Sequence, residues 1–263
     1  AGKDMMIYND GSDEIHNALA NLAVTTLNGI PFHRNDDDDS SSIYTHNVSG
    51  TDNLARGNTA YGVNALDAIT NGDNNTAIGY LSLSANNTGV ENTVLGRGAM
   101  NVSTTASYNV AVGNNAGAAM QTGDLYNTLV GHSAGGALTT GPTNVLIGAL
   151  AASAGTITGA SNNVIGYQAG KNISSGHSNI MIGDDSGRNV STGNNNVLIG
   201  HDVGNGFDTE THNLAIGTNA LGGAVAGGEF NISIGNNTLD ALTSGDNNVA
   251  VGYQAGSAIT SGG

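Results

Sequence analysis

The chain has 263 residues, of which 41 are glycine, only 10% are charged and 4% are aromatic, and it contains neither cysteine nor tryptophan. The lack of cysteine excludes a disulfide framework and a thiolate metal site, and the formal net charge of −15 argues against nucleic acid and anionic membranes as partners. No apolar run approaches the roughly 18 residues of a membrane-spanning helix, so we predict no membrane span. With so few large side chains, the composition favours a thin core filled by stacked coils.

The N-terminal segment, residues 1–57, differs from the rest, and we expect it to form a small α/β cap or attachment segment. Short apolar runs at 5–8 and 43–48 predict strands, and residues 13–23 carry apolar side chains at helical spacing, with Asp13 as the N-cap. The acidic run that begins at Asp36 and ends at Asp39 is typical of a solvated loop. Ca²⁺ binding there is the alternative, although the loop lacks the ligand spacing and the glycine of an EF-hand.

From residue 58 onward one motif recurs: Asn, two residues, an aliphatic residue and Gly. It occurs in twelve copies at a nearly constant interval, and the only copy without an aliphatic residue before the glycine has Tyr61 there. A fixed period of this kind indicates a solenoid, in which each unit stacks on its neighbours. We therefore predict an all-β fold over residues 58–263, a parallel β-solenoid or β-roll of about twelve 17–18-residue coils.

The two invariant positions of the motif have predicted structural roles. The asparagines would stack as an amide ladder along the long axis, and the glycines would permit positive φ at a corner of each coil. The predicted ladder comprises Asn58, Asn75, Asn92, Asn109, Asn127, Asn144, Asn162, Asn179, Asn196, Asn213, Asn231 and Asn248. The predicted corner glycines are Gly62, Gly79, Gly96, Gly113, Gly131, Gly148, Gly166, Gly183, Gly200, Gly217, Gly235 and Gly252.

The three residues before each corner glycine predict a short strand, and both faces of that strand are largely apolar. One face would fill the interior of the coil, whereas the other needs a second partner, because a solvated sheet alternates apolar with polar residues. The simplest partner is the same strand ladder from another copy. We therefore predict a homo-oligomer, most simply a homotrimer. The rest of each coil is expected to contain turns and a second short strand.

Three repeats are one residue longer than the others, those that end at Gly131, Gly166 and Gly235. An extra residue inside a strand would turn every later side chain to the opposite face, yet the strand pattern is intact on both sides of each long repeat. The extra residue must therefore lie in a corner, and we place it within 124–126, 152–158 and 221–227. Asn127, Asn162 and Asn231 should then stay in line with the other ladder residues.

Candidate chemistry is sparse. His132 and His201 both follow corner glycines, but four coils separate them, roughly 19 Å at strand spacing, so they cannot share a metal ion within one chain. Asp184, Asp185 and Asp202 also lie just after corner glycines. A carboxylate pair for glycan hydrolysis is the sharper interpretation of these three residues, but no aromatic sugar platform accompanies them. We therefore predict no enzymatic activity, no catalytic or metal-binding residue and no cofactor.

The two positions after each corner glycine vary most and should lie on an outward corner. They include Tyr80, Tyr167 and Tyr253, which are our candidates for surface binding, because a fixed core with variable corners suits recognition. Neutral drift at a loosely constrained surface explains the same variation.

Residues 55–263 resemble the repeats of bacteriophage tail-fibre proteins and the head repeats of trimeric autotransporter adhesins. The resemblance is carried by the Asn-x-x-Ile-Gly core, as in residues 75–80 (Asn-Thr-Ala-Ile-Gly-Tyr) and 248–256 (Asn-Val-Ala-Val-Gly-Tyr-Gln-Ala-Gly). It implies a trimeric, left-handed parallel β-roll, an attachment role outside the cell or on the virion surface, and a cell-surface glycan or protein receptor as partner. The adhesin heads have a shorter period than this chain.

The sequence thus predicts the shaft or head of an extracellular attachment fibre, and two alternatives stay open. One is a self-assembling filament subunit, stacked end to end through residues 1–57 and the last coil. The other is an ice-binding solenoid, which needs a flat and regular threonine array. The position three before the corner glycine begins as such a column, at Thr59, Thr76 and Thr93, but holds mostly Val, Ile or Leu after Asn144. We also expect that column to be buried.

Overall fold

The computed structural model describes residues 43–44, 55–123, 125–223 and 228–261. Three elements expected near the N-terminus lie outside these residues: the strand at 5–8, the helix at 13–23 and the acidic run with its candidate Ca²⁺ site at Asp36.

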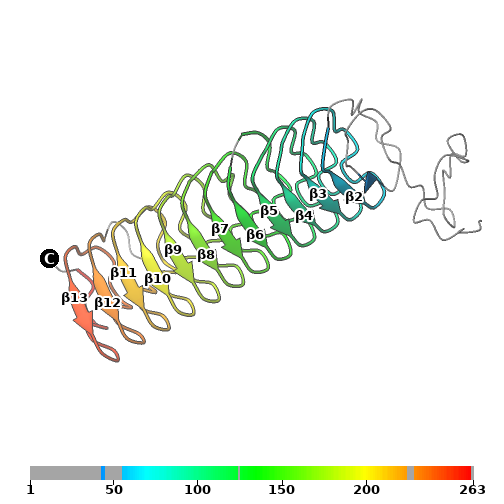
Figure 1. The fold of residues 1–263 in the computed structure, drawn as a ribbon. Helices are drawn as coiled ribbons and strands as arrows, with labels where there is room; N and C mark the ends of the chain where they lie inside the picture. The colour runs from blue at the N-terminus through cyan, green and yellow to red at the C-terminus, as the bar shows by residue number, and fades with distance from the viewer. Residues whose placement is uncertain (1–42, 45–54, 124, 224–227, 262–263) are drawn as a thin grey trace, which may run out of the picture.

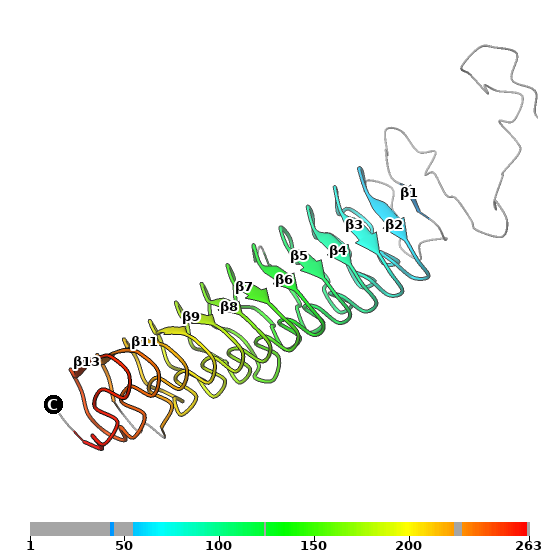
Figure 2. The same ribbon diagram turned by 90° about the horizontal axis from the view of Figure 1, so that it is seen from below.

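The described residues form one parallel sheet of 13 strands, arranged in chain order, and contain no helix. The strands stack along one side of an elongated spiral of coils, from β2 near one end to β13 near the other (Figures 1 and 2). Their bounds are β1 Ile43–Tyr44, β2 Thr59–Tyr61, β3 Thr76–Ile78, β4 Thr93–Leu95, β5 Val110–Val112, β6 Thr128–Val130, β7 Val145–Ile147, β8 Asn163–Ile165, β9 Ile180–Ile182, β10 Val197–Ile199, β11 Leu214–Ile216, β12 Ile232–Ile234 and β13 Val249–Val251. The predicted all-β parallel solenoid is confirmed, and its strands recur with the period of the sequence motif.

The sheet begins before the first repeat. Ile43 pairs with Thr59 and Tyr44 with Ala60, in the same parallel register as the later strands. The strand expected within 43–48 is therefore present at its first two residues. The segment that the sequence separates as a cap contributes β1 to the solenoid, so stacking starts on the N-terminal side of residue 58.

The prediction of a second short strand in each coil is wrong. Within the described residues, the part of the coil after the corner glycine consists of turns and bends, with an isolated bridge between Leu138 and Ile157 and a further bridge position at Ser107. The residues two and four positions after the corner glycine have positive φ, as at Leu81 (57°) and Leu83 (50°), which interrupts an extended chain. The turns nevertheless stack through backbone hydrogen bonds, such as that from Leu83 N–H to Ala99 O at 2.9 Å.

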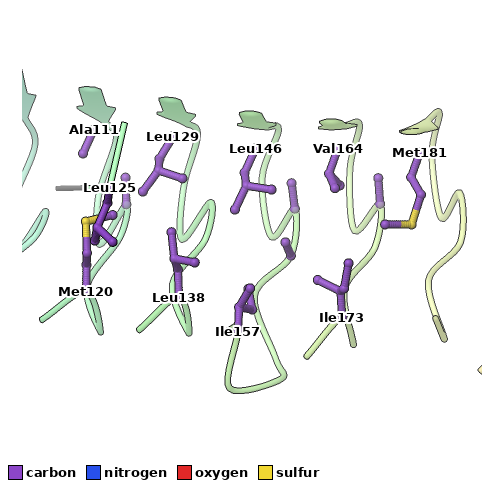
Figure 3. Packing of buried hydrophobic residues seen from close by; sticks show 14 of the residues in the cluster. Ala111, Met120, Leu125, Leu129, Leu138, Leu146, Ile157, Val164, Ile173 and Met181 are labelled. Carbon is purple, nitrogen blue, oxygen red and sulfur yellow. The ribbon is translucent and has the colours of Figure 1, made fainter. Parts of the chain in front are cut away.

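The core is a narrow channel between the strands and the turns. In strands β2 to β13 the middle residue points inward, whereas the residues on either side of it are partly or fully exposed. Figure 3 shows Leu129 from β6 and Leu138 from the facing turn pointing toward one another across this channel, and Leu146 and Ile157 repeat the arrangement in the next coil.

The two walls of the channel compensate for each other in size. In several coils the middle strand residue is small and the residue six positions later is large and buried, as at Ala77 and Leu83. In other coils the strand supplies the large residue and the later residue is glycine, as at Gly135 after Leu129, and a Cβ on Gly135 would lie 2.9 Å from the Cδ2 atom of that leucine. In these coils the two positions share one space, as close packing requires, whereas Ala111 with Gly117 and Leu146 with Ala152 depart from the pattern.

The predicted register of the long repeats is confirmed for Asn127 and Asn162, whose N–H groups donate to the Oδ1 atoms of Asn109 and Asn144 at 3.0 and 2.9 Å. Asn231 likewise donates to Asn213 at 2.9 Å. The extra residues therefore leave the ladder in line.

The extra residue of the repeat ending at Gly131 is located by the hydrogen bonds between coils. The bond from the first residue of β5 to Asn127 O spans one residue more than its equivalent from the first residue of β4 to Asn109 O. The bond from Ser107 N–H to Gly123 O, which lies just before β5 and β6, spans the same number of residues as the bond from the first residue of β4. The shift therefore lies within 124–126, as predicted.

The same comparison locates the extra residue of the repeat ending at Gly166. The bond from Gly135 to Ala151 O has the usual span for its position, whereas that from Thr139 to Ile157 O is one residue longer than its equivalent from Thr104 to Gln121 O. The shift therefore falls within 152–157, inside the predicted interval. Most of the third interval, 221–227, lies outside the described residues.

Candidate functional site

The ladder asparagines form a continuous hydrogen-bonded column inside the solenoid. In each successive pair the backbone N–H of the later asparagine donates to Oδ1 of the earlier one, at 2.7 to 3.1 Å. The column from Asn58 to Asn231 is at most 1% exposed. These contacts occupy backbone donors that would otherwise be buried without a partner.

The amide nitrogen of the ladder completes the link between coils. In most coils Nδ2 donates to a backbone carbonyl that lies shortly before the next ladder asparagine, as from Asn179 to Gly193 O and from Asn196 to Glu210 O, both at 2.8 Å. The position therefore needs an acceptor and a donor on a short side chain. Aspartate lacks the donor and glutamine is one methylene longer, which explains why asparagine recurs.

The corner glycines are required by backbone geometry and by contact with the next coil. Their φ angles lie between 123° and 145°, a region that L side chains rarely adopt. A Cβ on Gly200 would also lie 2.5 Å from the carbonyl oxygen of Gly217. The glycine at this corner therefore lets consecutive coils approach closely.

The sheet presents an outer strand face, which we define as the first and third residues of strands β2 to β13. This face is uncovered in the single chain: Tyr61 is 55% exposed and Leu95 is 46% exposed. The threonine column, which we expect to be buried, is not buried within the single chain, because Thr59 and Thr93 are exposed. The middle residue of the three-residue strand faces the core, so the flanking residues must face outward.

The candidate binding tyrosines lie on the outward corners, as expected for their positions, with Tyr80 at 47%, Tyr167 at 50% and Tyr253 at 72% exposure. Five coils separate each from the next, roughly 24 Å at strand spacing, so the structure does not bring them together into one site. Arg97 lies over the ring of Tyr80, 5.9 Å from its centroid.

Two aromatic contacts were missed by the sequence analysis. Tyr108 and Tyr126 stack with ring centroids 4.8 Å apart and planes 3° apart, and His212 stacks on Phe230 at 4.9 Å. All four residues immediately precede a ladder asparagine and have positive φ. The signal was available, because residues one period apart in a solenoid are spatial neighbours.

Two of the aspartates singled out by the sequence, Asp185 and Asp202, each contact one charged or titratable neighbour. His201 Nδ1 lies 3.1 Å from Asp202 Oδ2, and Arg188 Nε lies 3.6 Å from Asp185 Oδ1. No group of three or more His, Asp or Glu side chains in these residues is arranged to hold a metal ion. Each of the two pairs is partly exposed and serves as a local contact between neighbouring side chains.

Comparisons with models of protein families, with curated proteins and with solved structures found no match to this chain. Over residues 43–44, 55–123, 125–223 and 228–261, no helix has the length and hydrophobicity needed to cross a membrane.

Proposed function

We propose that this chain is a non-enzymatic structural protein, the shaft or head of an attachment fibre outside the cell or on a virion surface. The observation that carries the proposal is the outer strand face, a long and mostly apolar surface that a single chain leaves uncovered. The middle residue of these strands is already buried against its own coil, so the coil covers the inner face of the sheet and leaves the outer face without a partner in the chain. Large exposed apolar surfaces of this kind mark interaction sites.

The proposed partner on this face is the same face of other copies, in a homotrimer. In β9 to β11 both outward positions are aliphatic, for example Ile182, Ile199 and Ile216. Equivalent residues from three parallel copies would meet around a shared axis and bury these columns along the sheet. The resulting rod would have a hydrophobic seam and a polar outer surface, which suits a fibre that must be long, stiff and resistant to unfolding.

Cysteine cross-linking tests the arrangement, because the natural sequence contains no cysteine. Ile182→Cys should form disulfide-linked dimers between copies under mild oxidation, since equivalent residues meet at the axis, and light scattering should give three times the mass of one chain. Thr192→Cys, at an exposed turn position, is the matched control and should stay uncross-linked. A folded monomer at micromolar concentration would contradict the proposal.

Electron microscopy separates the fibre from the end-to-end filament. An attachment fibre predicts rods of one fixed length at every protein concentration. A filament subunit predicts rods that lengthen as concentration rises, because association at the ends follows mass action.

We propose the outward corners as the surface that binds a cell-surface glycan or protein receptor, with Tyr80, Tyr167 and Tyr253 as contacts. Their exposure and wide spacing support several weak contacts along the rod, which a trimer would multiply through multivalency. Replacing all three with alanine should reduce binding of the trimer to a glycan array or to host cells. Thr88→Ala, at an exposed position outside the corners, should leave binding unchanged.

A further inference from the structure

One column of the core contains two polar residues. The residue seven positions after the corner glycine is buried and apolar in the neighbouring coils, with Ile69 on one side and Met120 and Leu138 on the other. In the two coils between them the same position holds Asn86 and Ser103, and both are fully buried. Their backbones lie about one strand spacing apart, roughly 4.8 Å.

These two side chains have no protein partner. Nδ2 and Oδ1 of Asn86 and Oγ of Ser103 are all buried without a hydrogen bond. The amide lies beside Gly72 and Gly89, since a Cβ on Gly72 would lie 3.2 Å from the amide oxygen of Asn86 and a Cβ on Gly89 would collide with its Nδ2. The carbonyls of both glycines already accept hydrogen bonds from the asparagine ladder at 2.8 Å. A buried amide and hydroxyl left unpaired in this way are unfavourable.

We propose that the interior of these two coils holds an ordered water molecule bound by Asn86 and Ser103. A water molecule can accept from Nδ2, donate to Oδ1 and exchange a hydrogen bond with Oγ, which satisfies all three atoms. A metal cation would leave Nδ2 unpaired, because the NH₂ group is a hydrogen-bond donor and cannot ligate it. Neither Asn86 nor Ser103 carries a negative charge that would compensate the charge of the cation. The ligand is therefore neutral water.

The column also provides space for a water molecule. The side chain of Ser103 has half as many heavy atoms as those of Met120 and Leu138, which fill the same position in the following coils. The two glycines beside the amide add no side chain to the interior. The site is thus polar, and the short side chain of Ser103 leaves the space that larger residues fill in the following coils, which are the conditions that favour a buried water molecule.

Ser82 is also buried and unpaired but does not belong to the site. Its counterpart in a later coil, likewise three residues after a corner glycine, is Ser186, whose Oγ donates to Leu198 O at 2.9 Å. The equivalent carbonyl for Ser82 is that of Val94, twelve residues later. The arrangement seen at Ser186 would give the Ser82 hydroxyl this carbonyl as its acceptor, so Ser82 needs no water molecule.

A high-resolution crystal structure of the full chain tests the proposal. We expect density for a water oxygen within about 2.7 to 3.2 Å of the Asn86 amide and the Ser103 hydroxyl. The double variant Asn86→Leu with Ser103→Met recreates the apolar column and should lose that density while the melting temperature stays level or rises. A direct hydrogen bond between Asn86 and Ser103, or an interior without density beside them, would overturn the proposal. If the double variant fails to fold, the density in the natural protein decides alone.

Discussion

Leu198 occupies the space that a side chain at residue 204 would need. A Cβ on Gly204 would lie 2.9 Å from both Cδ atoms of this leucine. In an earlier coil the equivalent positions hold Ala77 on the strand and Leu83 on the facing turn, so the large residue lies on the turn instead of the strand. These two coils therefore fill the same space in the channel in two different ways.

This relationship predicts strong coupling between the two positions. Leu198→Ala should lower the free energy of unfolding by about 2–5 kcal/mol, because it leaves a cavity, and Gly204→Leu should destabilise the protein by overpacking. The double variant Leu198→Ala with Gly204→Leu reproduces the Ala77 and Leu83 coil and should recover most of the loss. Chemical unfolding in a double-mutant cycle measures the coupling. Additive single effects would contradict the idea that the two residues share one space.

The asparagine ladder predicts a cost for each lost amide. Asn196→Ala removes the acceptor for the N–H of Asn213 and the donor to Glu210 O, which should cost about 1–3 kcal/mol. Asn114→Ala, on an outward corner, is the control and should change the melting temperature little. If Asn196→Ala has the same melting temperature as the natural protein, the ladder contributes nothing to stability.

The corner glycines predict an intolerance to the smallest side chain. Gly200→Ala should incur about 1–3 kcal/mol from φ alone and a further penalty from the contact with Gly217 O. Gly136 has no positive φ, and its nearest non-bonded atom would be 3.2 Å from a new Cβ, so Gly136→Ala is the matched control. We expect soluble expression for the control variant and its loss for Gly200→Ala. Equal yields of folded protein would disprove the steric account.

The outer strand face predicts that assembly is obligate. Ile182→Lys with Ile216→Lys places charge on this face without touching the core, so the trimer should dissociate or fail to form in light scattering. Thr192→Lys should leave the mass unchanged. In the natural protein the melting temperature should rise with concentration, because assembly stabilises the folded chain. A melting temperature independent of concentration would argue against a folded state that depends on assembly.

The stacked tyrosines predict a smaller coupling on the surface. Tyr108→Ala and Tyr126→Ala each remove half of the pair, and a double-mutant cycle should give an interaction of about 0.5–1.5 kcal/mol. Tyr61 and Tyr80 lie one coil apart at different positions of the repeat and form the reference pair, for which no coupling is expected. A coupling as small as that of the reference pair would mean that the stacking adds no stability.

The period of the sequence was enough to predict strand positions, parallel order and register. Asn127 and Asn162 stay in line because backbone pairing transmits the register across an extra corner residue. The turns were harder to predict, since leucine has no preference for positive φ and nothing local distinguishes Leu81 or Leu83 from a strand residue. Their conformation is imposed by stacking on the next coil.

The candidate sites also divide into features that the repeat period predicts and features that depend on three-dimensional contacts. The exposure of Tyr80 and Tyr167 follows from their place after a corner glycine. The orientation of Thr59 could not be fixed from an apolar pattern on both faces, because either face could fill the channel. The unpaired state of Asn86 depends on which neighbouring carbonyls are already occupied, and this is visible only in three dimensions.

The hydrogen bonds between coils run along the rod, whereas the covalent chain runs around it. A pull applied at the two ends therefore stretches these bonds directly and detaches coils from an end, one at a time. Each detached coil would release about 55–60 Å of extended chain, many times its original length along the axis. Within one chain, the solenoid would therefore respond to force by lengthening in uniform steps, and pairing of the outer strand faces would oppose each step.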